Sequence, residues 1–156
     1  MTQAWHIVHE DSIAQAFDGE GARLTGGRWN SEGTRMVYTA GTLALALLEI
    51  IVHLEIKSTL KYFKAVPVSF NGEWIEEIAL ESLPPFWNQL PPGFSTKAIG
   101  DQWVRTASSS ILRVPSAVVP NESNYLFNPQ HPLFKKITIG QPINLPIDPR
   151  MVHKLK

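Results

Sequence analysis

Glu49 is the residue whose surroundings in the sequence most strongly indicate chemistry. It interrupts an apolar run, 43–54, whose residues favour a helix. A carboxylate in such a helix is costly to bury without a partner, and His53 follows one helical turn later on the same face. Two interpretations are open. Glu49 lies at the domain edge, solvated or paired with His53, or it is a catalytic carboxylate in a dry pocket.

Two further candidates precede this helix. Arg28 directly follows Gly26 and Gly27, and a guanidinium beside exposed backbone can bind a phosphate or diphosphate through paired hydrogen bonds. Tyr38 could stack its ring on a flat heterocycle such as nicotinamide. Taken singly, a surface Arg in a flexible loop and a core Tyr are the simpler interpretations. The glycines match neither a dinucleotide fingerprint nor a P-loop.

Ser116 lies between Pro115 and Ala117 in an apolar segment. Neither a Gly-x-Ser-x-Gly motif nor a Ser-His-Asp pattern surrounds it, so we do not expect a nucleophile, although its hydroxyl could donate to a ribose or phosphate. The chain has no Cys, which excludes thiolate nucleophiles, disulfides and Cys-based zinc sites. The five His residues lack metal-binding spacing, and the sequence therefore predicts no metal.

Composition limits the classes of partner. The 156 residues fit one domain, 1–156, and 14 basic against 14 acidic residues give a formal net charge of zero. Proteins of nucleic acids or anionic membranes usually carry a basic excess, so neither partner is expected. The most apolar run is far shorter than the roughly 20 residues of a membrane span. With an N-terminus unlike a signal peptide, the sequence predicts a soluble cytoplasmic protein.

The elements that must position these residues suggest a mixed α+β domain. Segments rich in β-branched and aromatic residues are expected to be strands: 5–8, 35–40, 60–70, 111–119 with an interruption at Pro115, and 136–145. We expect a helix capped by Thr42 that is buried on all sides, and a second helix over 100–109 capped by Asp101. Segments rich in Gly, Pro or Asn are expected to be loops: 18–33, 80–93 and 121–132.

Taken in order, these motifs resemble the RES domain family over nearly the whole chain. The resemblance rests on 21–31 (GARLTGGRWNS), 37–40 (VYTA), 43–49 (LALALLE), 114–120 (VPSAVVP), 124–129 (NYLFNP) and the ending 148–150 (DPR). The family is named for an Arg, a Glu and a Ser. These fall on Arg28, Glu49 and Ser116, while the family Ser could instead be one of three nearby residues: Ser108, Ser109 and Ser110.

The resemblance implies a fold, an activity and a partner. The fold would be similar to that of ADP-ribosyltransferases, an α+β domain with a split mixed sheet and an NAD-binding cleft. The protein would be the toxin of a type II toxin–antitoxin pair, and its partner would be an Xre-family antitoxin. Within that complex the toxin could form a homo-oligomer. It would cleave the nicotinamide–ribose bond of NAD+ by hydrolysis or phosphorolysis, with NAD+ as substrate and no cofactor.

The residues would then divide the chemistry among them. Glu49 would stabilise the oxocarbenium character that develops on the ribose. Arg28 would anchor the diphosphate, Tyr38 would pack on nicotinamide, Ser116 would help fix the ribose or phosphate, and Asn30 would join the NAD+-binding residues. The alternatives are an ADP-ribosyltransferase that modifies a cellular protein and a non-catalytic interaction module. A ribonuclease is least favoured, because the chain is neutral and shows no His pair for acid–base work.

Overall fold

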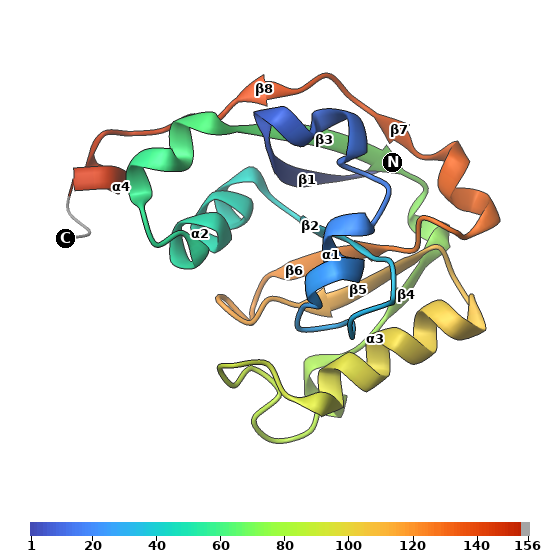
Figure 1. Ribbon diagram of the computed structural model, residues 1–156. Coiled ribbons are helices and arrows are strands. Elements are labelled where there is room, and N and C mark those ends of the chain that lie inside the picture. The colour runs from blue at the N-terminus through green and yellow to red at the C-terminus, as the bar shows by residue number, and fades with distance from the viewer. Residues whose placement is uncertain (154–156) are drawn as a thin grey trace.

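The computed structural model describes residues 1–153 and contains an eight-stranded sheet in the order β4-β5-β6-β2-β1-β3-β7, with β8 also paired to β3 (Figure 1). The strands are β1 (Thr2–His9), β2 (Val37–Ala40), β3 (Phe63–Phe70), β4 (Ile75–Glu77), β5 (Ile111–Pro115), β6 (Ser123–Phe127), β7 (Thr138–Ile139) and β8 (Ile143–Asn144). The α-helices are α1 (Glu20–Thr25), α2 (Leu43–His53), α3 (Phe94–Thr106) and α4 (Arg150–His153). Short 3-10 helices connect them: η1 (Glu10–Gln15), η2 (Lys57–Tyr62), η3 (Gly72–Trp74), η4 (Leu80–Ser82) and η5 (Pro132–Lys136).

The sheet is split where β1 meets β2. All eight residues of β1 pair with β3, and all four residues of β2 pair with β6. Between β1 and β2, by contrast, the register holds one pair, Trp5 with Ala40. The two halves of the sheet diverge from this junction (Figure 1). This arrangement, with antiparallel pairs and one parallel pair between β4 and β5, confirms the predicted α+β fold with a split mixed sheet.

A different helix covers each half of the sheet. Trp103 of α3 packs with Leu112 of β5 and Leu126 of β6 in one buried cluster. Leu47 of α2 packs with Leu60 and with β3 in another. Burial of each such side chain stabilises the fold by about 1.5–3 kcal/mol. The helices are therefore fixed to opposite sides of the split.

The predicted helix after Thr42 is confirmed, but its predicted burial is wrong. The Thr42 hydroxyl accepts a hydrogen bond from the Leu45 amide at 3.1 Å, as an N-cap does. Leu47 is buried, whereas Leu48 is 41% and Val52 56% exposed. The run is apolar on both faces, yet only one face has a sheet to pack against.

Several predicted boundaries are corrected by pairing and packing. α3 begins at Phe94 rather than near residue 100, so Asp101 lies inside the helix and does not cap it. The predicted loop 121–132 contains β6, which pairs with β2 on one side and β5 on the other. The predicted strand 136–145 is broken into β7 and β8, because Pro142 offers no amide donor to a ladder. The strand 111–119 ends at Pro115, where an interruption was predicted.

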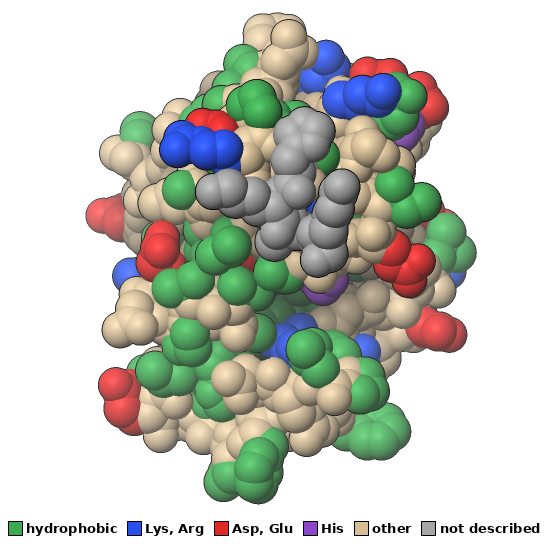
Figure 2. Space-filling model, turned by 90° about the vertical axis from the view of Figure 1, so that its left-hand side faces the viewer, with side chains coloured by type: hydrophobic (Ala, Val, Ile, Leu, Met, Phe, Trp, Pro, Cys, Tyr) green, Lys and Arg blue, Asp and Glu red, His purple; other side chains and the backbone are tan. Residues whose placement is uncertain are grey.

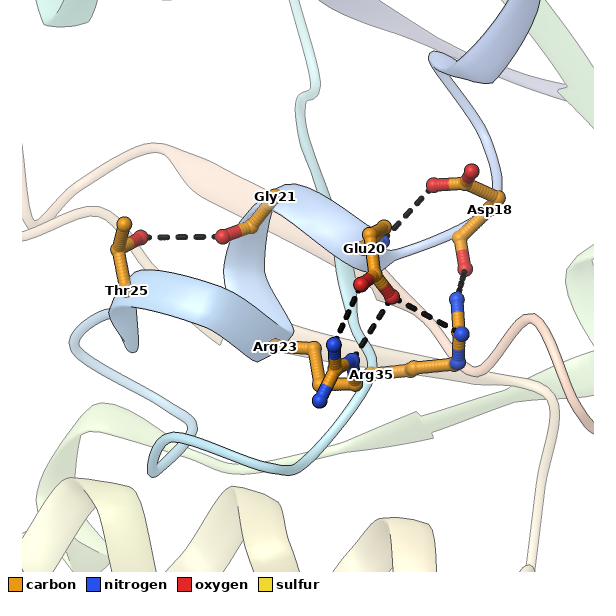
Figure 3. Close-up of polar contacts among 6 residues, drawn as sticks. All are labelled: Asp18, Glu20, Gly21, Arg23, Thr25 and Arg35. Carbon is orange, nitrogen blue, oxygen red and sulfur yellow. Dashed lines mark hydrogen bonds and ion pairs between the residues drawn. The ribbon is translucent and has the colours of Figure 1, made fainter.

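The glycine-rich segment 18–33, predicted to be a loop, contains the short helix α1. The Glu20 carboxylate pairs with Arg23 at 2.5 and 2.8 Å and with Arg35 at 2.9 Å (Figure 3). Just before the helix, whose N-cap is Gly19, the Asp18 side chain accepts a hydrogen bond from the Glu20 amide at 2.8 Å. A helix this short needs such contacts, because nucleation is unfavourable in isolation. Within 1–153, no helix is long and apolar enough to cross a membrane.

Candidate active site

A cleft of about 710 Å³ opens at the split in the sheet. Its walls come from β1, β2, β6, α2, α1 with the segment that follows it, and the loops at 88–92 and 117–118. Among the predicted site residues, it is lined by Arg28, Tyr38 and Glu49. Apolar side chains gather around a hollow on the side of the molecule that Figure 2 shows. This volume lies in the range of small-molecule binding sites.

Glu49 reaches the cleft from α2, and its carboxylate is held by two side chains. The Asn124 amide donates to Oε1 at 2.9 Å, and the Ser116 hydroxyl donates to Oε2 at 2.9 Å. His53 also lines the cleft, but the two side chains that bind Glu49 are Asn124 and Ser116, and not His53. Burial raises the pKa of Glu49 above its usual range, and the hydrogen bonds from Asn124 and Ser116 act in the opposite direction.

Ser116 lies behind Glu49 and is fully buried. Besides donating to the carboxylate, its Oγ accepts hydrogen bonds from the amides of Val118 at 3.1 Å and Val119 at 3.2 Å. It is not among the residues that line the cleft. The Ser116 hydroxyl therefore holds the Glu49 carboxylate and does not line the cleft. From the sequence, it was expected to contact a ribose or phosphate.

The three alternative serines lie elsewhere. The hydroxyls of Ser108 and Ser109 donate to the carboxylate of Glu76 on β4, at 2.6 and 3.3 Å. Ser110 is fully buried, and its hydroxyl has no hydrogen-bond partner among the described residues. Of the four candidate serines, Ser116 is thus the one that contacts Glu49.

Arg28 faces the cleft with part of its guanidinium already engaged. Nη1 donates to the carbonyls of Trp87 at 2.9 Å and Gln89 at 3.0 Å, in the loop that precedes α3. Burial lowers the pKa of Arg28 from its usual value, but an Arg stays protonated in proteins. A guanidinium has five N–H donors, so the bonds within the described chain leave the Nε and Nη2 side of the group for an anion.

Tyr38 and Asn30 form a pair in which one residue faces the cleft and the other supports it. The Tyr38 hydroxyl donates to Asn30 Oδ1 at 2.6 Å and accepts from the Trp29 amide at 3.0 Å. Burial raises the pKa of Tyr38, so the hydroxyl stays protonated. Asn30 is fully buried and donates to the carbonyls of Ala22 and Thr34. Asn30 therefore organises the segment around Arg28, in contrast to the NAD+ contact expected for it.

Asn124 and His6 line the cleft, and neither was identified as a site residue from the sequence. Asn124 anchors Glu49 and also donates to the Thr39 carbonyl at 3.1 Å. It stands in a segment assigned to a loop from the sequence. In the structure Asn124 is part of β6 and pairs with Ala40 of β2, and its side chain contacts Glu49. His6 of β1 lies at the split, and its Nδ1 is 2.8 Å from the Tyr38 carbonyl. Burial lowers the pKa of His6, so its imidazole is neutral at pH 7.

The chain is similar to known proteins over nearly its whole length. The sequence matches the RES domain over residues 3–148. It is 35% identical over 148 residues to "Toxin Res" of Yersinia enterocolitica, covering 94% of this chain and 97% of that relative. It is 37% identical over 158 residues to "Prs ADP-ribosylating toxin" of a Sphingobium species, covering 98% of each.

The fold also has a solved counterpart. A chain in the crystal structure of the Mycobacterium tuberculosis MbcT–MbcA toxin–antitoxin complex superimposes with a TM-score of 0.73 at 15% identity, covering 99% of this chain and 88% of that one. At this identity the likeness concerns the fold alone. The extent of the sequence match and the identity to relatives named toxins confirm the resemblance read from the motifs. This chain belongs to the RES domain family.

Proposed function

We propose that this protein is the toxin of a toxin–antitoxin pair and that it cleaves the nicotinamide–ribose bond of NAD+, by hydrolysis or phosphorolysis. One observation carries the proposal: a half-buried carboxylate, Glu49, faces a cleft that also presents Arg28 and Tyr38. The names of the two relatives support a toxin, and the structural neighbour, solved in a toxin–antitoxin complex, supports a protein antitoxin. An Xre-family antitoxin and action in the cytoplasm complete the proposal.

Glu49 acts on the bond that breaks. As the C–N bond lengthens, its electron pair moves to the nicotinamide ring nitrogen, which neutralises the pyridinium and leaves positive charge on the ribose. A carboxylate beside that charge stabilises it, and most strongly where water is excluded. The donors Asn124 and Ser116 fix the carboxylate in place before substrate arrives. Water then adds to the ribose carbon and releases a proton, or phosphate adds in its stead.

The remaining residues bind and orient the dinucleotide. Arg28 offers its Nε and Nη2 donors to the diphosphate, while Nη1 stays on the loop carbonyls. The Tyr38 ring packs on the nicotinamide, held by hydrogen bonds at its hydroxyl. Nicotinamide leaves as a neutral molecule, so the scheme requires neither a strong acid nor a cofactor besides the substrate NAD+.

A second candidate function uses the same cleft. The Sphingobium relative is named an ADP-ribosylating toxin, which favours transfer of ADP-ribose to a protein acceptor in place of water or phosphate. NAD+ labelled in its adenosine half distinguishes the two, because transfer leaves label on a protein band whereas hydrolysis or phosphorolysis leaves it in small molecules. A non-catalytic interaction module is disfavoured, because Arg28, Tyr38 and Glu49 all line one cleft.

The decisive experiment measures NAD+ over time with purified wild type and Glu49→Gln, with and without inorganic phosphate. We expect wild type alone to consume NAD+, and any dependence on phosphate names the acceptor. Glu55→Gln is the matched control, since Glu55 is an exposed carboxylate just beyond α2. Wild-type turnover by a folded Glu49→Gln protein would refute the assignment.

A further inference from the structure

One face of α3 touches the segment that carries Arg28. The contacts come from Lys97, Gly100 and Asp101, which follow one another at helical spacing and therefore share that face. All three meet the backbone of residues 27–31. None of the three lines the cleft itself. They stand behind the site, on the side away from a ligand.

Lys97 binds the backbone on both sides of Arg28. Its ammonium donates to the Gly27 carbonyl at 2.5 Å and to the Asn30 carbonyl at 3.3 Å. Hydrogen bonds from a charged donor are stronger than neutral ones. A half-buried ammonium is also costly to leave without acceptors. Both effects favour the one backbone conformation that brings these two carbonyls together.

Asp101 fixes the far end of the same segment. Its Oδ1 accepts a hydrogen bond from the Ser31 amide at 2.9 Å, across 70 positions of sequence. The carboxylate thus holds a backbone donor while Lys97 holds backbone acceptors one turn earlier. The opposite charges match the opposite polarity of the groups they bind.

Gly100 explains why the helix can come so close. A Cβ atom at this position would lie 1.6 Å from the Trp29 carbonyl oxygen and 2.7 Å from its carbonyl carbon. Any side chain would therefore push the helix and the segment apart. Trp29 cannot yield easily, because its side chain is buried in the cluster with Trp103 and Trp87.

We propose that Lys97 and Asp101 are positioning residues that, with Gly100, clamp residues 27–31 so that Arg28 is aimed at the diphosphate of the bound dinucleotide. The identity of that ligand rests on the proposed function, whereas the clamp itself is a property of the free protein. Gly26 and Gly27 leave this segment little conformational preference of its own. The contacts with α3 therefore add to the order that Asn30 and Tyr38 give this segment.

Steady-state kinetics test the role of the clamp. Displacing a binding group by about 1 Å can cost on the order of 100-fold, and we expect Lys97→Met to raise the KM for NAD+ by about tenfold with a smaller change in kcat. Lys97→Arg keeps a cationic donor and should recover most of the binding. Arg105→Met is the matched control, because Arg105 is an exposed cation on the same helix.

A double variant separates positioning from general destabilisation. If Lys97 acts through Arg28, then Lys97→Met combined with Arg28→Ala should bind NAD+ no more weakly than Arg28→Ala alone. If the fold-losses in NAD+ affinity of the two single variants instead multiplied in the double variant, the two residues would act independently and the proposal would be overturned. Melting temperatures of all variants show whether each protein remains folded at the assay temperature.

Amide hydrogen exchange gives a readout that needs no NAD+. In Lys97→Met and Asp101→Ala, the amides of Trp29 and Ser31 should exchange faster, while the β3 amide of Val66 keeps the wild-type rate. Unchanged exchange at Trp29 and Ser31 would overturn the clamp, and faster exchange with unchanged KM would overturn its role in binding. If wild type neither binds nor consumes NAD+, the proposed function fails and the exchange rates alone decide the clamp.

Discussion

Removing the Ser116 hydroxyl should affect both stability and catalysis. This fully buried group donates to Glu49 and accepts from the amides of Val118 and Val119, so Ser116→Ala removes three hydrogen bonds at once. Loss of a hydrogen bond to a charged group costs about 1.5–3 kcal/mol, and orphaned amides add to that loss. We expect the free energy of unfolding to fall by about 2–3 kcal/mol. For a domain of this size the Tm should fall by about 4–12 °C.

The same change should move the pH dependence of NAD+ consumption. The hydrogen bond from Ser116 lowers the pKa of Glu49 against the effect of burial, so its removal should raise that pKa further. The proposed mechanism requires the carboxylate form, which is lost as pH falls through the pKa of Glu49. The acid limb of the rate profile should therefore shift to higher pH in Ser116→Ala, as measured by initial rates of NAD+ loss across a pH series.

Ser110→Ala is the control for this prediction. Ser110 is as buried as Ser116, but its hydroxyl has no hydrogen-bond partner among the described residues. Its replacement should leave Tm and the rate profile near those of wild type, because no bond is lost. If Ser116→Ala matched Ser110→Ala in both measurements, the support that we assign to the Ser116 hydroxyl would be refuted.

Further substitutions test other contacts of the site. Burial raises the pKa of Glu49 in the folded protein, so the contribution of Glu49 to stability is present at low pH and is lost as pH rises. At pH 7, Glu49→Gln should therefore unfold at a higher temperature than wild type. This difference in unfolding temperature should shrink in acid. Asn124→Leu should shift the acid limb of NAD+ consumption upward, as Ser116→Ala does, because it also removes a donor to Glu49. Gly27→Ala should weaken NAD+ binding measured by calorimetry, since its Cβ would lie 2.6 Å from the Tyr38 hydroxyl. Arg28→Ala should raise the KM for NAD+ by about tenfold or more, because one charge-assisted contact is lost. An unchanged KM would contradict the role of Arg28 in anchoring the diphosphate.

Local sequence signals predict the elements that local interactions determine. The helix after Thr42 follows from its cap and from residues that favour helices. The strand within 121–132 escapes prediction because the composition of this segment is that of a turn-rich loop. β6 exists because β2 and β5 pair with it on both edges, and such pairing overrides local preference.

The same distinction applies to the site. Glu49 stands out in the sequence because a carboxylate interrupts an apolar run. The partners of Glu49 do not stand out in the sequence, because Ser116 lies 67 positions away from it and Asn124 lies 75 positions away. The contacts of Lys97 and Asp101 likewise reach across 70 positions. No periodicity or spacing predicts contacts of this range, and the family resemblance names residue types without saying which of them support others.

The split in the sheet explains why Glu49 needs partners from distant segments. α2 packs Leu47 against the β1–β3 half, whereas Ser116 follows β5 and Asn124 belongs to β6, on the other half. The two hydrogen bonds to Glu49 therefore connect the two halves of the sheet, in addition to the single register pair that joins β1 to β2. A widening of the cleft would break these two hydrogen bonds and expose the Glu49 carboxylate to solvent. The hydrogen bonds that orient the carboxylate thus also connect the two halves, so the position of Glu49 in the cleft depends on the closed arrangement of the sheet.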